Sequence, residues 1–202
     1  MMERVHDVLA NWPYPPDGGW TADDLDLLPQ DGPHGELDFF KHVELVDGAL
    51  IFMSPRRRFH DLVIRRLADV LDRSAPAGLT TAAQMDIRLG PRQRPCPDVV
   101  LVDSAVAADL NRTSYLAGEV HLVIEVVSPE SEHRDRHVKP RIYANAGLEH
   151  FWLIEEEHGS PVAHTYRLDQ VTGFYTGTGI HRGQLKPEEP FPIDIDLAEL
   201  VR

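Results

Sequence analysis

The sequence has little cysteine and no long hydrophobic run. Its single cysteine, Cys96, excludes an internal disulfide, and its place between two prolines beside an apolar run predicts a small buried thiol rather than a nucleophile. No stretch approaches the roughly 18 consecutive apolar residues of a membrane-spanning helix. The N-terminus carries Glu3 and Asp7 and does not resemble a secretory signal. We therefore expect a soluble cytoplasmic protein with no membrane partner.

Positive charge is also scarce. The chain has 20 Lys and Arg but 33 Asp and Glu, which gives a net charge of −13. Such a balance argues against a nucleic-acid partner, since phosphates supply most non-specific affinity. The charge is unevenly distributed, however: residues 1–55 hold 2 basic and 11 acidic side chains, residues 56–142 hold 14 and 12, and residues 143–202 hold 4 and 10. A local basic rim and an ordinary solvated surface both remain open for the middle segment.

Length and pattern predict one domain of mixed α/β, or α+β, structure. A chain of 202 residues with 42% hydrophobic content can form one sizeable core. We expect an irregular N-terminal arm over residues 1–20, rich in Pro, Gly and Trp, and a single domain over residues 21–202. Within that domain, apolar periodicity and turn signals predict helices at 22–28, 58–73 and the far end of 134–146, and strands at 43–46, 49–53, 80–83, 85–89, 97–102, 122–127, 151–154 and 162–168. This interleaving indicates a mixed sheet covered by helices.

One carboxylate interrupts the apolar strand 122–127. Burying Glu125 without a partner costs several kcal/mol or forces the side chain to be neutral, so a cation or a metal must compensate it. A second acid, Asp98, lies at the start of the strand 97–102. If these strands are neighbours, the two carboxylates meet at one edge and offer the oxygen ligands that Mg²⁺ or Mn²⁺ prefers. A metal held in this way serves phosphodiester hydrolysis by activating water and neutralising phosphate charge.

The order of several short motifs resembles a known family. The motifs are Glu44, Pro97-Asp98, the run 125–129 (EVVSP), Asp135 with Lys139, the run 143–147 (YANAG) and the run 151–154 (FWLI). Over roughly residues 36–160 the chain is similar to the bacterial Uma-two family, which is assigned to the PD-(D/E)XK nuclease superfamily. The resemblance implies a restriction-endonuclease-like mixed central sheet flanked by helices, here with extra C-terminal strands. It also implies that Asp98 and Glu125 are metal ligands and that Glu44 is an additional acid near the metal.

The superfamily's usual lysine is missing from its strand. That lysine normally follows the acid by two residues, where this chain has Val127. The family resemblance places a substitute at Lys139, projecting from the following helix toward the acids. A lysine there can orient the attacking water and stabilise the transition state. Pro140 disfavours a helical conformation for the residue before it, which leaves the aim of the Lys139 side chain open.

Each acid also has a purely structural interpretation. Glu125 can be a core glutamate paired with an arginine such as Arg88 or Arg141, and Asp98 can cap a turn after Pro97. For the whole chain, the leading prediction is a divalent-metal-dependent endonuclease acting on DNA, and the Trp- and Pro-rich arm makes a homodimer a reasonable assembly. The alternatives are a catalytically inactive nuclease-fold module with a binding or regulatory role, and a phosphodiesterase acting on a small substrate.

Overall fold

The computed structural model describes residues 12–33, 35–53 and 57–202. More than half of the predicted N-terminal arm therefore lies outside the described residues, and residues 12–20 contain no helix or strand. No helix in the described ranges is long and apolar enough to cross a membrane. The division into an arm and a single domain over residues 21–202 stays a prediction.

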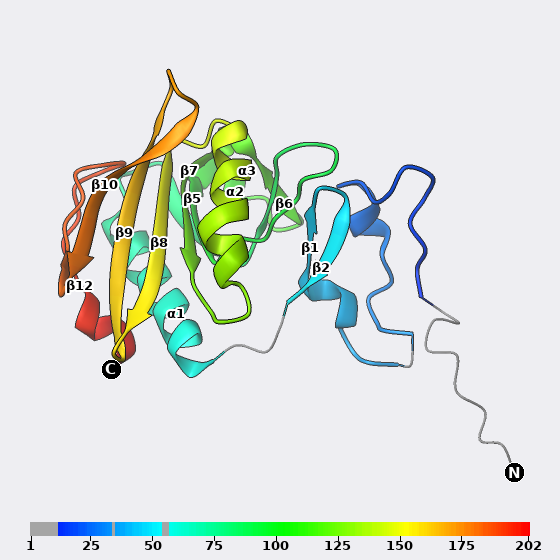
Figure 1. Ribbon diagram of the computed structural model, residues 1–202, viewed down its shortest axis with the longest axis horizontal. Helices are drawn as coiled ribbons and strands as arrows, with labels where there is room; N and C mark the ends of the chain where they lie inside the picture. Colours follow the sequence, from blue (N-terminus) through cyan, green and yellow to red (C-terminus); the bar gives the residue numbers. More distant parts are fainter. Residues whose placement is uncertain (1–11, 34, 54–56) are drawn as a thin grey trace, which may run out of the picture.

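A six-stranded mixed sheet forms the centre of the molecule (Figure 1). Neighbouring β7 and β8 are parallel, whereas every other neighbouring pair in this sheet is antiparallel. The strands, in their order across the sheet, are β10 (Phe174–Arg182), β9 (Ser160–Asp169), β8 (His150–Glu157), β7 (Val120–Val126), β5 (Val99–Asp103) and β3 (Leu79–Ala83). The predicted mixed central sheet flanked by helices is confirmed, and β9 and β10 are among the C-terminal strands that extend it.

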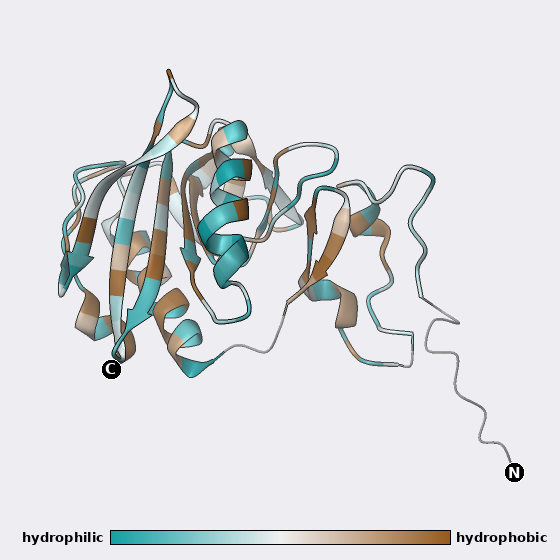
Figure 2. Cartoon of the chain, viewed as in Figure 1, coloured by the Kyte–Doolittle hydropathy of each residue, from teal (hydrophilic) through white to brown (hydrophobic). Residues whose placement is uncertain are grey.

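Helices cover both faces of this sheet because its central strands are apolar on both sides. Ile124 of β7 packs in the core beneath α1 (Arg58–Ser74) and the C-terminal 3₁₀ helix η5 (Leu197–Val201). Its neighbour Val123 points to the opposite face and packs with Tyr143 of α3 (Lys139–Asn145). Figure 2 shows α3 mostly teal on its visible side, as expected for a helix with one solvent-facing surface. Side chains alternate along a strand, so Glu125 lies on the same face of the sheet as Val123, toward α3.

A hairpin outside the large sheet is formed by β1 (Val43–Val46) and β2 (Ala49–Phe52). Asp47 and Gly48 at its turn have φ values of 51° and 78°, as a two-residue type I′ turn requires. The strands predicted at 43–46 and 49–53 are therefore confirmed, and they pair with each other as a hairpin. The remaining short elements are η1 (Asp24–Leu27), η2 (Phe39–His42), β4 (Asp86–Arg88), α2 (Ser104–Ala107), β6 (Ser114–Leu116), η3 (Ala117–Glu119), β11 (Gln184–Leu185) and β12 (Ile195–Asp196).

Two predicted elements are shorter than expected. The helix expected at 22–28 is only the 3₁₀ turn η1, because the Asp24 carboxylate accepts hydrogen bonds from both the backbone N–H and the hydroxyl of Thr21 and closes a turn. The strand expected at 85–89 is reduced to β4, which pairs with β6 instead of joining the large sheet.

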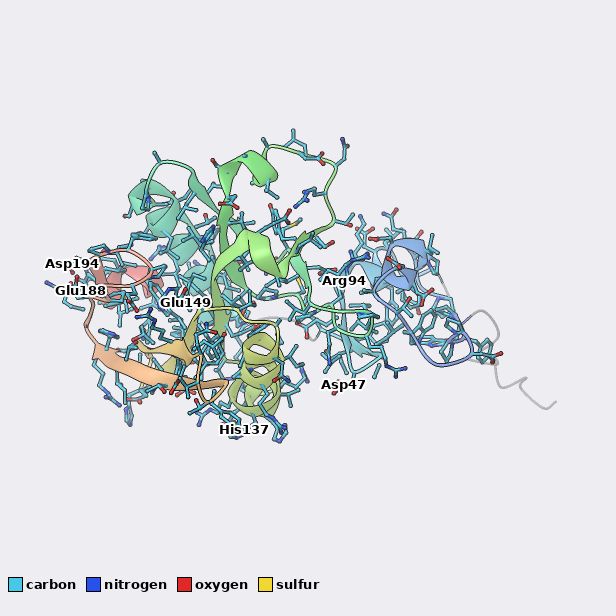
Figure 3. The ribbon with its side chains drawn as sticks, turned by 90° about the horizontal axis from the view of Figure 1, so that it is seen from above. Asp47, Arg94, His137, Glu149, Glu188 and Asp194 are labelled. Carbon is cyan, nitrogen blue, oxygen red and sulfur yellow. The ribbon has the colours of Figure 1, made fainter. Side chains whose placement is uncertain are left out.

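A buried arginine connects the N-terminal segment to the rest of the chain (Figure 3). Arg94 is only 3% exposed. Its Nε lies 2.7 Å from Asp86 Oδ2, and its Nη2 lies 2.9 Å from Asp26 Oδ1. Its Nη1 donates to the carbonyl oxygen of Ala22 over 2.9 Å. Burial raises the pKa of Asp86 to about 6 even though Arg94 opposes this shift, so the carboxylate depends on its arginine partner.

We expect Arg94→Ala to lower the free energy of unfolding by about 3 kcal/mol, because it leaves Asp86 without its cation in a poorly solvated place. Chemical denaturation measures this loss. The matched control is Arg88→Ala, which removes ion pairs to Asp23 and Asp26 that lie nearer solvent. It should cost about 1 kcal/mol or less. Equal losses in the two variants would contradict the role given to Arg94.

Candidate active site

The pairing of β5 with β7 brings two predicted site residues together. Val99 lies opposite Ile124 in this antiparallel register, so Asp98 and Glu125 are adjacent across the strand pair. The Asp98 Oδ2 accepts a hydrogen bond of 2.8 Å from the backbone N–H of Val126. Asp98 therefore bonds to the neighbouring strand, rather than closing a turn after Pro97.

Lys139 forms the centre of the cluster. Its Nζ lies 2.8 Å from Glu44 Oε1, 3.0 Å from Glu125 Oε2 and 3.5 Å from Asp135 Oδ1. Lys139 is 4% exposed and Glu125 is 1% exposed, so water does little to screen these charges. The arginine partners considered for Glu125 are wrong, because its cation is Lys139. The four residues predicted for the site, Glu44, Asp98, Glu125 and Lys139, lie in one buried cluster.

The helix that carries Lys139 has an unusual first turn. Residues Arg134–Val138 form the π-helix η4, and the N–H of Lys139 bonds to the carbonyl of Arg134, five residues earlier. Lys139 itself is helical, with φ −59° and ψ −43°, although Pro140 follows it. A proline ring clashes with the carbonyl four residues earlier in a regular α-helix, and the wider π turn relieves that crowding. Lys139 therefore stays within the helix and faces the acids.

Tyr143 lies one helical turn after Lys139 and shares its face. Its hydroxyl donates a hydrogen bond to Glu125 Oε1, while Lys139 binds the other oxygen. Burial and the nearby Glu125 carboxylate raise the Tyr143 pKa well above its usual value, so the phenol stays protonated as a donor. The sequence prediction did not include Tyr143. Two signals pointed to it: its spacing of four residues from Lys139, and its place at the start of the run 143–147 that contributes to the family resemblance.

Helix α1 supplies a histidine to the same cluster. His60 is buried, and its Nε2 lies 3.3 Å from Asp98 Oδ2. Its Nδ1 has no hydrogen-bond partner among the described residues. Asp98 is thus held from two sides, by His60 and by the backbone of β7. The sequence places His60 in the first turn of the helix predicted at 58–73, but it does not show whether that turn faces the site or the solvent.

A small cavity opens beside the cluster. It has a volume of about 50 Å³ and is lined by Glu44, Asp98, Glu125, Asp135 and Lys139, with His60, Met53, Cys96, Ser128, Glu130, Ser131 and Arg134 completing it. Such a space holds an ion and its waters but no drug-sized molecule, since small-molecule pockets typically occupy about 300 Å³ or more. Cys96 is buried, and its burial raises its thiol pKa well above the usual value, in agreement with a structural role.

The cluster carries more negative than positive charge. Four carboxylates, those of Glu44, Asp98, Glu125 and Asp135, surround a single ammonium group. Burial raises the pKa of Glu125 well above its usual value, and it also raises that of Asp135. Burial alone lowers the pKa of Lys139, but the surrounding carboxylates outweigh it and raise that pKa well above normal. The site therefore favours additional positive charge, either as protons or as a cation.

The donor atoms of the cluster suit a hard divalent cation. They are carboxylate oxygens, and Asp135 Oδ1 is buried without a hydrogen-bond partner among the described residues. Across those same residues, no three Asp, Glu, His or Cys side chains converge in an arrangement ready to hold a metal ion. Both oxygens of Glu125 already accept hydrogen bonds, one from Lys139 and one from Tyr143. The residues fit a metal such as Mg²⁺ or Mn²⁺ chemically.

Comparisons with known proteins agree with this fold. The Uma2 family, described as "Putative restriction endonuclease", matches residues 39–199. A crystal structure of a "putative nuclease belonging to DUF820" from Anabaena variabilis ATCC 29413 superposes with a TM-score of 0.66 at 15% sequence identity, over 90% of this chain and 97% of that chain. No curated protein matches the chain. At this identity the crystal structure supports the fold, whereas the match over 39–199 carries the family assignment: the chain belongs to the Uma2 family of restriction-endonuclease-like proteins.

Proposed function

We propose that the chain is a divalent-metal-dependent endonuclease that hydrolyses phosphodiester bonds, with DNA as its substrate. The observation that carries this proposal is the excess of buried carboxylates around Lys139. A buried cluster of four acids and one ammonium group is costly for stability alone, and a divalent cation would neutralise most of its surplus charge. Membership of the Uma2 family supports the same chemistry.

Each residue of the cluster has a role in this proposal. Asp98 and Glu125 would hold the metal, with Glu44 as an additional acid near it. When bound, the metal supplies an activated water and neutralises charge on the phosphate oxygens. Lys139 orients the attacking water and stabilises the negative charge that develops in the transition state. Tyr143 and His60 position the carboxylates of Glu125 and Asp98, respectively.

DNA is the proposed substrate because the segment of the chain that supplies most of the cavity lining is less acidic than the rest of the chain. Residues 56–142 hold 14 basic and 12 acidic side chains, within a chain of net charge −13. Arg134 lines the cavity itself. A homodimer would present two such sites to the two strands of a duplex, and a monomeric mass in solution at working concentration would contradict that arrangement.

Metal binding should stabilise the protein. At a Mn²⁺ concentration about 100 times its dissociation constant, we expect the free energy of unfolding to rise by about 2.7 kcal/mol. Asp98→Asn keeps an acceptor for the Val126 N–H but removes a charge, and it should lose most of this increase. Asp103→Asn at the far end of β5 is the matched control, since Asp103 pairs with His121 outside the cluster. Denaturation with Mn²⁺ and with chelator measures the effect, and an equal response in both variants would exclude the assigned ligand.

Metal affinity should increase with pH. Burial raises the pKa of Glu125, so this carboxyl group keeps its proton to a higher pH than a solvent-exposed glutamate does, and a metal has to displace that proton to bind. Below the raised pKa, we expect Mn²⁺ affinity to grow by up to about tenfold per pH unit for each proton released. Calorimetry at pH 6, 7 and 8, in buffers of different ionisation enthalpy, counts those protons. Glu125→Gln should release one proton fewer, and an affinity that is flat across this range would contradict the prediction.

Cleavage assays test the activity directly. Wild type should cleave DNA with Mg²⁺ or Mn²⁺ but not with chelator, when supercoiled plasmid, single-stranded DNA and RNA are compared. Lys139→Arg keeps the charge but changes the donor geometry, and we expect a loss of roughly 10²-fold to 10³-fold in rate. Glu125→Gln should be inactive, and Asp103→Asn should retain full activity.

The outcomes of the cleavage assay separate the possible functions. Cleavage that survives in Glu125→Gln would come from a contaminant and would not support the proposal. Intact metal binding without cleavage of any nucleic acid would exclude the nuclease and leave a binding or regulatory module. Circular dichroism establishes that each variant is folded before its rate is compared.

A further inference from the structure

A second, larger pocket lies on the outer side of α3. It has a volume of about 380 Å³ and lies between that helix and the hairpin that joins β9 to β10. Figure 1 shows this hairpin extending beyond the neighbouring strands. The volume is within the range of about 300–1,000 Å³ that small-molecule sites occupy. The proposed metal cluster does not include any residue of this pocket.

Aromatic rings form much of the wall of this pocket. The four rings are those of Phe151, Tyr166, Phe174 and Tyr175. Phe151 and Tyr166 are stacked with centroids 5.6 Å apart, and Phe151 also contacts Tyr175 at 5.5 Å. Phe174 is different, because it is 66% exposed and has no ring contact among the described residues. A large ring left open to solvent at the rim of an aromatic pocket is well placed to stack on a planar ligand.

Two arginines and an amide complete the pocket. Arg136 pairs with Glu155 over 2.8 Å, whereas Arg141 makes no ion pair with any described residue. Arg141 and Asn145 also line a neighbouring hollow beside α3, so both side chains lie where the two hollows meet. A guanidinium group binds phosphate, and an amide can donate and accept hydrogen bonds at a base edge. The pocket therefore offers an aromatic surface for a planar ring of a ligand and a cation for an anionic group of the same ligand.

The same helix separates this pocket from the metal cluster. Lys139 faces inward to the acids, while the next two residues, Pro140 and Arg141, line the pocket. At the helix entrance, Arg134 lines the cavity at the cluster and Arg136 lines the aromatic pocket. Arg136 is paired with Glu132 and Glu155, so Arg141 is the cation of this pocket without an ion pair among the described residues. A free cation beside aromatic rings is the combination that proteins use to bind single-stranded nucleic acid.

We propose that this pocket binds one nucleotide of a single strand, with its base stacked on Phe174 and its phosphate on Arg141. The proposal rests on the proposed nuclease function, in that it assigns the place where the strand is held beside the cleavage site. Stacking on aromatic side chains is tolerant of sequence, because every base has a flat face. The pocket would therefore select single-stranded or unpaired nucleotides without reading a sequence.

Binding of a short strand tests the pocket. The probe is a 5′-phosphorylated tetranucleotide that contains 2-aminopurine, added to the full chain in chelator at low salt so that no cleavage is required. Wild type should quench the fluorescence of the probe as the base stacks. Phe174→Ala should bind about tenfold more weakly and lose the quenching. Val171→Ala is the matched control, because Val171 is 95% exposed beside the same hairpin turn and does not line the pocket.

The salt dependence tests the phosphate contact separately. Arg141→Ala should lower the slope of log K against log salt by about 0.7, as expected for the loss of one phosphate contact on a single strand. Arg73→Ala is the control, since Arg73 lies exposed on α1 and pairs with Asp69. An unchanged slope in Arg141→Ala would overturn the phosphate assignment, and equal affinity in Phe174→Ala and Val171→Ala would overturn the stacking assignment.

Two comparisons separate this inference from a site for a free nucleotide and from the proposed nuclease function. Deoxyadenosine monophosphate is titrated beside the tetranucleotide, and equal affinities would make a free nucleotide the occupant and overturn the assignment of a strand. If the tetranucleotide binds with quenching while no nucleic acid is cleaved, the pocket stands and the proposed nuclease function fails. If DNA is cleaved while wild type neither binds nor quenches the tetranucleotide, the function stands and the pocket assignment is wrong.

Discussion

The buried ammonium group of Lys139 is the interaction on which the rest of the site depends. Glu44 arrives from a hairpin, Glu125 from the central strand and Asp135 from the turn before the helix, and all three lie within 3.5 Å of the same nitrogen. Removal of that cation would leave several carboxylates buried without compensation, which is among the most destabilising changes a protein core can suffer. The hairpin, the sheet and α3 are therefore connected electrostatically as well as by packing.

A cluster of this kind is a poor way to stabilise a fold. Buried ion pairs seldom repay the cost of removing their charges from water, and apolar side chains of similar volume often stabilise a core as well or better. The strands around Glu125 show what such a core looks like, since Val123, Ile124 and Val126 are fully buried beside it. The acids are therefore retained at a cost to stability, and perturbed pKa values in a cavity are typical of functional sites.

Much of the fold was predictable because it is local. The Asp47-Gly48 turn and the apolar run around Glu125 act through neighbours in the chain, and the structure has both elements. Contacts between distant elements were harder to predict. The pattern of the helix at 58–73 does not say that it brings His60 to Asp98, and Tyr143 was missed because it lies on a helix whereas its partner Glu125 is on the strand β7. The roles of Asp98, Glu125, Lys139 and Glu44 in catalysis stay predictions, because their proximity does not measure a reaction.

Neighbouring residues of the short helix α3 face opposite sides, one toward the buried acids and the other toward solvent. Lys139 and Tyr143 are separated by one turn and face the buried acids, whereas Arg141 lies between them in sequence and faces solvent. The π turn of η4 allows this alternation to begin at a residue that precedes a proline. A lysine on the strand itself would occupy the position of Val127 and would tie the cation to the sheet. Because the lysine is on a helix instead, the inner face of α3 contacts the acids while its outer face lines the aromatic pocket. A change in α3 therefore acts on the acidic cluster and on the aromatic pocket together.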